Sequence, residues 1–212
     1  MKIVRFDYLP EYANTYVIGE EGGPCLIVDL GDEGFSRLAA YCHRHHSKIC
    51  AALLTHGHYD HIAGLRDFPD NIPIFIHNDE KGLLFGRNNL SAMFMGESFI
   101  PNEDLYYYFF EDGDEMVMPP FSFKIIHTPF HTQGSSCFYF ESGDRRVLFS
   151  GDTLFRLGIG RTDLPGGREN LVAPSLRKLT SLHPETIVYP GHGASTKIGD
   201  EIRMNPYFAG LK

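Results

Sequence analysis

The sequence His56-Gly57-His58-Tyr59-Asp60-His61 directly follows an apolar run, Ile49 to Thr55. The apolar run predicts a buried strand, so the polar residues are expected on a loop at its carboxyl end. These histidines and this aspartate cannot all face a core, because buried imidazoles and carboxylates without partners cost free energy. A metal site therefore explains the segment better than a solvated polar loop does. Gly57 lets the backbone bend so that two imidazoles approach one ion at roughly 2.0–2.1 Å.

Other predicted strands are also followed by residues that can bind metal, and these residues are His131, Asp152 and His192. Open α/β folds place their sites at the carboxyl ends of strands. A loop at a strand end is rigidly positioned and free of ladder hydrogen bonds, which suits a preorganised metal site. We therefore expect these residues to complete the site that the His56–His61 segment begins.

The predicted donors divide between two ions, and Asp152 is suited to bridge both because a carboxylate has two oxygens. The other ligands are a three-histidine set for one ion and a mixed set for the second: His56, His58 and His131, and Asp60, His61 and His192. Two cations about 3.5–4 Å apart can share a hydroxide of lowered pKa and stabilise an oxyanion as it forms. Asp60 and Asp152 would orient that hydroxide.

Apolar periodicity predicts the remaining elements. Strands are expected at Ile3 to Phe6, Asn14 to Ile18, Cys25 to Leu30, Pro73 to Ile76, Tyr106 to Phe110, Phe121 to Ile126, Cys137 to Phe140, Arg146 to Ser150 and Thr186 to Tyr189. Helices are expected from about Gly34 to His46 with Asp32 as a cap, from Asp79 to Phe85, and from near Ala173 to Leu182. The stretch from Gly86 to Asp104 has no clear period and is either a flap or a short helical insert.

Composition limits the classes of partner. The chain has 212 residues, and we expect one domain over residues 1–212. A formal net charge of -8 disfavours nucleic acid, because binding a phosphate backbone needs a concentrated basic surface. No apolar run approaches the length of a membrane span, so no membrane association is expected. The cysteines lack CxxC spacing and are expected to be reduced, as in a cytoplasmic protein: Cys25, Cys42, Cys50 and Cys137.

The ordered set His-x-His-x-Asp-His, His131, Asp152 and His192 resembles the metallo-β-lactamase superfamily over almost the whole chain. The resemblance implies a mixed α and β fold, a four-layer αββα sandwich of two mixed β-sheets flanked by helices. It also implies that the ligands are those assigned above and that the cofactors are two divalent metal ions, with zinc expected and iron or manganese as alternatives.

Several segments are similar to short bacterial-type members of the glyoxalase II-like (hydroxyacylglutathione hydrolase-like) group. They are Gly151-Asp152-Thr153-Leu154-Phe155, Gly160-Arg161-Thr162-Asp163-Leu164-Pro165-Gly166-Gly167 and Pro190-Gly191-His192-Gly193. The chain departs from that group at Phe130, where glycine is usual, and Tyr59 fills a variable position. Both rings are expected to add bulk near the metals. The chain ends soon after Pro206-Tyr207-Phe208, so we expect no C-terminal glutathione-binding helical domain.

Some polar residues outside the ligand set have two interpretations each. Asp29 could accept the far N–H of a ligand histidine, or it could cap the following helix. Arg161 could bind a substrate carboxylate or form a salt bridge with Asp163. His127 matches no ligand position and is expected either to contact a metal ligand from its outer side or to be structural. A further histidine group, His43, His45 and His46, is expected in solvent at a helix carboxyl end.

The resemblance implies hydrolysis of a small-molecule thioester, such as S-lactoylglutathione or a related acyl-thioester, by a metal-bridging hydroxide. One alternative is a mononuclear iron persulfide dioxygenase, whose iron would be held by His56, His131 and Asp152. Another is a lactonase-type hydrolase of the same superfamily. An aspartate rather than a cysteine at position 152 disfavours β-lactam hydrolysis.

Overall fold

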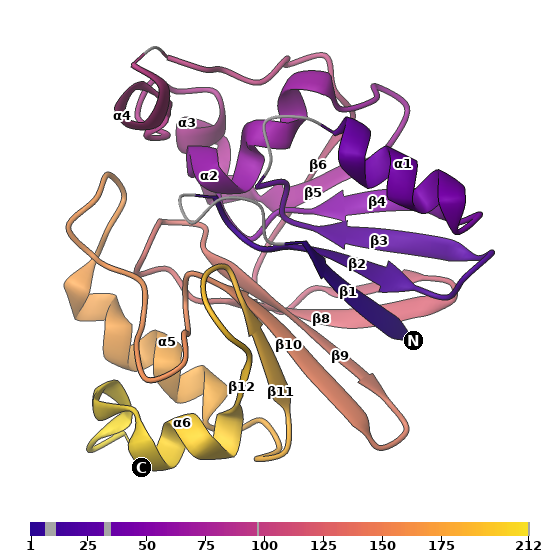
Figure 1. The fold of residues 1–212 in the computed structure, drawn as a ribbon. Helices are drawn as coiled ribbons and strands as arrows, with labels where there is room; N and C mark the ends of the chain where they lie inside the picture. Colours follow the sequence, from indigo (N-terminus) through magenta and orange to yellow (C-terminus); the bar gives the residue numbers. More distant parts are fainter. Residues whose placement is uncertain (7–11, 32–34, 97, 212) are drawn as a thin grey trace. The chain divides into compact units, whose positions relative to one another are not determined.

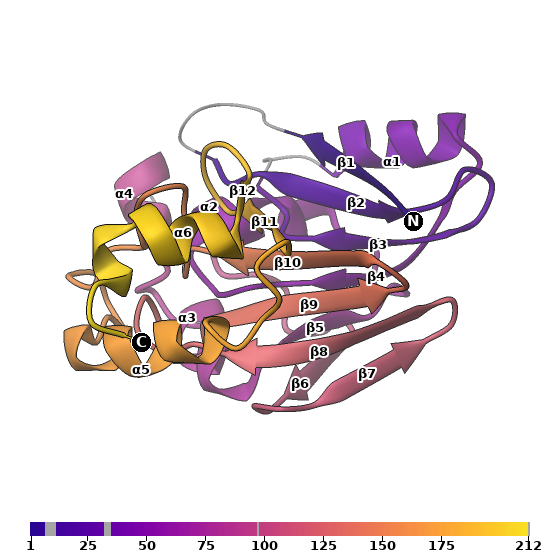
Figure 2. The ribbon, with the colours of Figure 1, turned by 90° about the horizontal axis from the view of Figure 1, so that it is seen from below.

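The computed structural model describes residues 1–6, 12–31, 35–96 and 98–211, with the backbone alone for residues 94 and 95. The chain forms two compact units, Met1–Phe109 and Phe110–Lys212. The described sheets have six strands each, ordered β1-β2-β3-β4-β5-β6 and β12-β11-β10-β9-β8-β7. Figure 1 labels all of these strands except β7, which is labelled in Figure 2. Both sheets mix parallel and antiparallel pairs and are flanked by helices, which confirms the predicted fold class.

The first unit contains β1 (Lys2–Phe6), β2 (Thr15–Gly19), β3 (Pro24–Val28), α1 (Ser36–Arg44), β4 (Lys48–Leu53), α2 (Tyr59–Ile62), β5 (Ile74–His77), α3 (Lys81–Leu84), α4 (Ser91–Met95) and β6 (Tyr107–Phe110). Short 3₁₀ helices occupy Ala63–Asp67 and Asn78–Glu80. In the stretch from Gly86 to Asp104, α4 corresponds to the helical-insert interpretation rather than to a flap without secondary structure.

Three parallel strands of the first sheet end at one edge. β3 pairs in parallel with β4, and β4 pairs in parallel with β5. Their carboxyl ends therefore meet at the same edge. Asp29 follows β3, the His56–His61 segment follows β4, and residues 78–84 follow β5. The topology thus brings three segments with polar or ligand-type side chains to the same edge of the first sheet.

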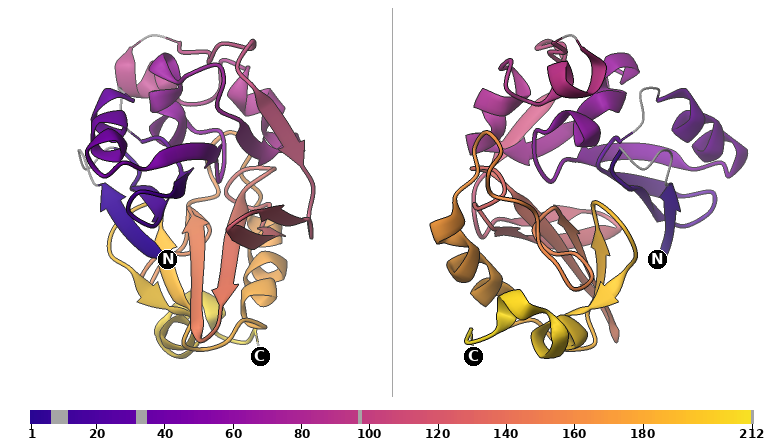
Figure 3. Two further views of the ribbon diagram at one scale, coloured as in Figure 1. Left: turned by 90° about the vertical axis from the view of Figure 1, so that its right-hand side faces the viewer. Right: turned by 60° about the vertical axis from the view of Figure 1, so that its left-hand side comes forward.

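Helix α1 covers one face of this sheet (Figures 1 and 3). Leu38 and Cys42, one helical turn apart, are buried and share a core with strand residues such as Ile27. The predicted cap Asp32 lies outside the described residues. The histidines at the end of the helix are exposed or half-buried, as expected of a solvated helix terminus: His43, His45 and His46.

The second unit contains β7 (Glu115–Met118), β8 (Phe121–His127), β9 (Ser136–Ser142), β10 (Arg145–Gly151), α5 (Val172–Leu179), β11 (Ile187–Pro190), β12 (Thr196–Lys197) and α6 (Ile198–Met204). Short 3₁₀ helices lie at Glu169–Leu171 and Pro206–Phe208. Helices α5 and α6 contribute Leu176, Leu179 and Ile198 to one core with strand residues, and Figure 2 shows both helices on the same side of the sheet.

Strands β8, β10 and β11 run in one direction, because β9 is antiparallel to both β8 and β10 and β11 is parallel to β10. Their carboxyl ends lead into His131, Asp152 and His192. The second sheet therefore repeats the arrangement of the first, with donors at one edge. Among the described residues, no helix combines the length and the hydropathy needed to cross a bilayer.

Candidate metal centre

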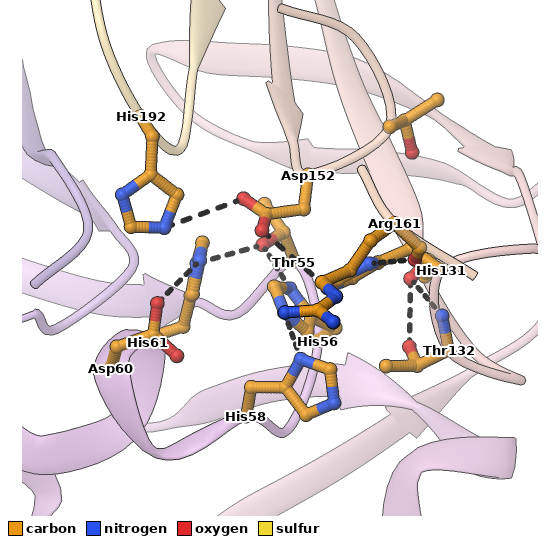
Figure 4. A network of polar contacts seen from close by, with 12 residues as sticks. Thr55, His56, His58, Asp60, His61, His131, Thr132, Asp152, Arg161 and His192 are labelled. Atoms are coloured by element: carbon orange, nitrogen blue, oxygen red, sulfur yellow. Dashed lines mark hydrogen bonds and ion pairs between the residues drawn. The ribbon is translucent and has the colours of Figure 1, made fainter. Parts of the chain in front are cut away.

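The first unit gathers its predicted ligands into a buried cluster, drawn with its neighbours in Figure 4. His56 Nε2 lies 3.1 Å from His58 Nδ1, and the centroids of the His56 and His61 rings lie 4.0 Å apart. His61 Nε2 lies 3.6 Å from Asp60 Oδ2. Donor atoms on one tetrahedral ion, each roughly 2.0–2.1 Å from it, lie about 3.4 Å apart. The separations in this cluster therefore suit shared metal ions.

The carboxylate of Asp29 orients this cluster through the His61 nitrogen that faces away from Asp60. Its Oδ2 lies 2.8 Å from His61 Nδ1, which directs the ring so that Nε2 faces Asp60. Its Oδ1 accepts the backbone N–H of Thr55 at 2.8 Å, and the Thr55 hydroxyl donates to Oδ2 at 2.9 Å. A carboxylate on the far nitrogen of a histidine fixes its tautomer and raises its basicity as a ligand.

Thr55 belongs to the candidate site but was not predicted from the sequence. Besides its bonds to Asp29, its hydroxyl lies 3.1 Å from His56 Nδ1 and 3.4 Å from His61 Nδ1. It thus contacts the outer nitrogens of two predicted ligands. The available signal was a hydroxyl residue at the end of a strand, directly before the ligand segment.

The second half of the predicted loop is helical, so the expectation of a loop over the whole segment was wrong. Asp60 and His61 lie on α2, which spans Tyr59–Ile62. A four-residue helix is too short to show a period, which is why the sequence did not reveal it. An acidic residue in the first turn, such as Asp60, favours this conformation through the helix dipole.

The two aromatic residues that directly precede predicted ligands pack in the cores of their units. Tyr59 is fully buried in the core of the first unit, with its ring 5.6 Å from that of Phe99. Phe130 is fully buried in the core of the second unit beside Leu176 and Leu179. Burial of large apolar rings is the ordinary outcome, because it removes their area from water.

In the second unit, Asp152 lies between two histidines (Figure 4). Its Oδ2 is 3.4 Å from His131 Nε2, and its Oδ1 is 3.8 Å from His192 Nε2. Each carboxylate oxygen thus faces a different imidazole. Donor separations of this size would allow each oxygen and its neighbouring imidazole to share a divalent cation.

The orientation of the His131 ring depends on the loop that follows β10. Its Nδ1 lies 2.7 Å from the carbonyl oxygen of Arg161, so Nε2 is the nitrogen directed at Asp152. Gly160 donates its backbone N–H to the Asp152 carbonyl at 2.8 Å. A Cβ on Gly160 would lie 2.1 Å from that oxygen and 2.9 Å from His131 Nδ1. Only glycine fits there, a requirement that the sequence analysis did not identify.

The Arg161 side chain forms the ion pair with Asp163 that was one of its two predicted roles. Nε and the terminal nitrogen each lie 2.6 Å from a different oxygen of the carboxylate, and both side chains are exposed. This bond holds the pKa of Asp163 down at about 2. His127 Nε2 lies 2.8 Å from the Gln133 carbonyl oxygen, a contact that fits the structural interpretation.

The seven predicted metal ligands thus divide between the two units, and each unit brings its own members together: His56, His58, Asp60 and His61 in the first, and His131, Asp152 and His192 in the second. Each cluster offers imidazole nitrogens and carboxylate oxygens, the donors that zinc and iron accept in proteins. The donor types and their separations fit divalent cations.

Comparison with protein families places these clusters in a known context. Residues 8–192 match the model of the metallo-beta-lactamase superfamily. The chain is 35% identical to a protein named probable metallo-hydrolase YqgX from Bacillus subtilis (strain 168), covering 100% of this chain and 99% of that protein. It is 33% identical to the hydroxyacylglutathione hydrolase GloC of Haemophilus influenzae, covering 92% of each.

Solved structures show the same similarity. The crystal structure of the BLEG-1 B3 metallo-beta-lactamase superposes with a TM-score of 0.88 at 32% identity, covering 99% of this chain and 100% of that one. The structure of TTHA1623 in a di-iron-bound form superposes with a TM-score of 0.80 at 34% identity, covering 96% of this chain and 99% of that one.

Proposed function

The chain belongs to the metallo-beta-lactamase superfamily, and on that basis we propose that it is a binuclear metallohydrolase that cleaves acyl-thioesters. The observation that carries this proposal is Asp152, whose two oxygens face the Nε2 atoms of His131 and His192. A carboxylate that had only to hold one histidine would need one of those contacts. A carboxylate shared by two ions would instead place each oxygen near a histidine of a different ligand set, which agrees with these two separations.

We assign the ligands as two sets joined by Asp152. One ion takes the three-histidine set, the other takes the mixed set, and the members are His56, His58 and His131, and Asp60, His61 and His192. The order of these residues along the chain and their resemblance to the family support the assignment. Zinc is the metal that we propose, with iron as the main alternative because a similar solved structure is a di-iron form.

Two divalent ions bound by these ligands would lower the pKa of a water molecule and polarise a carbonyl group. Asp60 and Asp152 would orient the attacking water by accepting its hydrogen bonds. Asp29 and the Arg161 carbonyl hold His61 and His131 in place through their outer nitrogens. The protein needs no serine or cysteine nucleophile in this scheme, because water itself attacks the carbonyl.

The proposed substrate is a small-molecule thioester, with S-lactoylglutathione as the first compound to test. Its support is the 33% identity to a hydroxyacylglutathione hydrolase over 92% of both chains, together with the motifs around Asp152 and His192 that resemble the glyoxalase II-like group. A thioester carbonyl suits a site that stabilises a developing oxyanion electrostatically.

β-Lactam hydrolysis is a second candidate, favoured by the similarity to a solved B3 metallo-beta-lactamase. It would use the same donors against an amide carbonyl. We rank it below thioester hydrolysis, because the relative named as a hydroxyacylglutathione hydrolase supports the thioester.

The test is a panel of substrates with zinc-loaded protein: S-lactoylglutathione, a simple acyl-cysteamine thioester, a lactone and a cephalosporin. We expect the two thioesters to give the highest kcat/KM. The variant Asp152→Asn should abolish turnover, and Asp163→Asn, which alters an exposed aspartate in the same region, should retain it. Cephalosporin or lactone turnover exceeding that of both thioesters would contradict the proposal, as would oxygen uptake with a persulfide by protein that holds one iron.

A further inference from the structure

Glu80 is a fully buried carboxylate outside the predicted ligand set. It lies in the 3₁₀ helix Asn78–Glu80, which begins where β5 ends. The side chain of His77 starts this turn by accepting the backbone N–H of Asp79 at 3.1 Å. Because β4 and β5 are parallel neighbours, their ends bring Glu80 beside the ligand segment that follows β4.

The contact between the two segments is a short hydrogen bond. Gly57 donates its backbone N–H to Glu80 Oε2 at 2.6 Å. A bond of this length from a backbone amide fits an ionised carboxylate, because charge-assisted bonds are shorter and stronger than neutral ones. Gly57 separates His56 from His58, so the bond fixes the peptide that joins two predicted ligands.

The packing around this bond is tight. A Cβ on Gly57 would lie 3.1 Å from both Glu80 Oε2 and the Cβ of Leu83, so the ligand segment rests against the turn that carries the carboxylate. The separation of 3.1 Å between His56 Nε2 and His58 Nδ1 depends on this local backbone shape. Movement of Gly57 would change it directly.

A buried negative charge is costly unless cations or hydrogen bonds offset it. Two divalent ions would supply positive charge close to this segment, and so the carboxylate and the ions would stabilise each other. We propose that Glu80 is a positioning residue that holds the His56–His58 segment in its metal-binding shape and raises its affinity for divalent cations. This inference rests on the proposed metal-dependent function, and it assigns no ligand role to Glu80.

The experiment measures zinc affinity of metal-free protein by competition with a chromophoric chelator. We expect Glu80→Gln, which keeps an acceptor oxygen but loses the charge, to weaken binding about tenfold. Glu80→Ala should weaken zinc binding further. The expected loss lies within about 10–100-fold, the usual effect of removing a residue that contacts a metal ligand from its outer side. The visible spectrum of the cobalt-loaded Glu80→Ala protein should also shift, because the geometry of the histidine pair changes.

Glu201→Gln is the matched control, since Glu201 is equally buried and accepts the backbone N–H of Leu157 at 2.9 Å. It should lower stability but leave zinc affinity and the cobalt spectrum unchanged. Circular dichroism of the metal-free variants establishes folding, and Glu80→Gln carries the test if Glu80→Ala does not fold.

Wild-type zinc affinity in Glu80→Gln, or a loss no larger than that of Glu201→Gln, would overturn the inference. A wild-type protein that binds zinc but hydrolyses no thioester would instead refute the proposed function alone, since the affinity comparison needs no substrate.

Discussion

Asp152 is the residue on which the proposed chemistry depends most, because it touches both histidines of its cluster. Asp29 contacts His61 from the outer side only. We predict that Asp29→Asn lowers metal affinity about 10–100-fold, whereas Asp152→Asn loses thioesterase activity far more severely even at saturating metal. Steady-state kinetics across a zinc titration separate the two effects. Equal kcat values for Asp29→Asn and Asp152→Asn at saturating zinc would show that Asp152 does not bridge the two ions.

Gly160 is the second critical position at the residue scale. A methyl group there would meet the Asp152 carbonyl at 2.1 Å and His131 Nδ1 at 2.9 Å, so Gly160→Ala must displace one ligand or both. Overpacking of this kind costs about 1–3 kcal/mol, and zinc affinity should fall with it. Gly158→Ala is the control, because its Cβ would meet nothing nearer than 4.0 Å. If calorimetric zinc titration gave the same affinity for both variants, the close contact at Gly160 would be irrelevant to the site.

The reactivity of the Cys137 thiol tests whether this side chain is buried. Burial raises the pKa of the Cys137 thiol to about 11, so the thiolate, which is the reactive form, is lost as pH falls below that value. At pH 8 only about one thiol in a thousand is ionised. We predict that iodoacetamide modifies the half-buried Cys50 first and Cys137 only after denaturation. Mass spectrometry of peptides from native protein checks this order, and early labelling of Cys137 would contradict it.

At the scale of elements, the insert that carries α4 is tied to the ligand helix α2. The Ser91 hydroxyl donates to Asn89 Oδ1 at 2.7 Å and accepts the Phe99 N–H at 2.8 Å. The backbone carbonyl of Asn89 accepts the backbone N–H of Tyr59 at 2.6 Å, directly before the proposed ligand Asp60. Order in the insert is therefore coupled to the position of α2.

We predict that Ser91→Ala destabilises the protein by about 1–3 kcal/mol, because the buried Phe99 N–H loses its acceptor. Asn89 Oδ1 loses the hydroxyl donor but keeps the backbone N–H of residue 91. Ser181→Ala, which removes an exposed hydroxyl bonded to the Lys178 carbonyl, should change stability by less than about 0.5 kcal/mol. Urea denaturation measures both values. A change in Ser91→Ala as small as that of the control would mean that the insert is held by other contacts.

The elements that the sequence predicted are those with strong apolar periodicity. β4, β8, β10 and β11 were expected close to their observed bounds. β4, β10 and β11 contain apolar runs bounded by polar or turn residues, and β8 begins with alternating apolar and polar residues. α6 was missed, since its short span Ile198–Met204 is rich in charge and its buried Glu201 is held by side-chain bonds from Thr196 and Asn205. β7 and β12 were missed because strands of four and two residues carry too little pattern.

At the scale of the whole molecule, the fold class and the proposed ligands could be predicted because ligands follow strands in a fixed order. The residues that orient these ligands could not be predicted. Thr55, Glu80 and Gly160 act through contacts with residues distant in sequence or through the absence of a side chain, and no local pattern encodes such contacts. The sequence thus predicted the donors, and the structure added the groups that orient them.

The proposed function requires that one chain holds two metal ions. Calorimetric titration of zinc into metal-free protein tests it most directly, with His192→Ala as the matched variant because His192 belongs to one proposed ligand set only. We predict a stoichiometry of two for the wild type and one for His192→Ala, since the three-histidine set remains intact. A stoichiometry of one for the wild type, or of two for both proteins, would contradict the account.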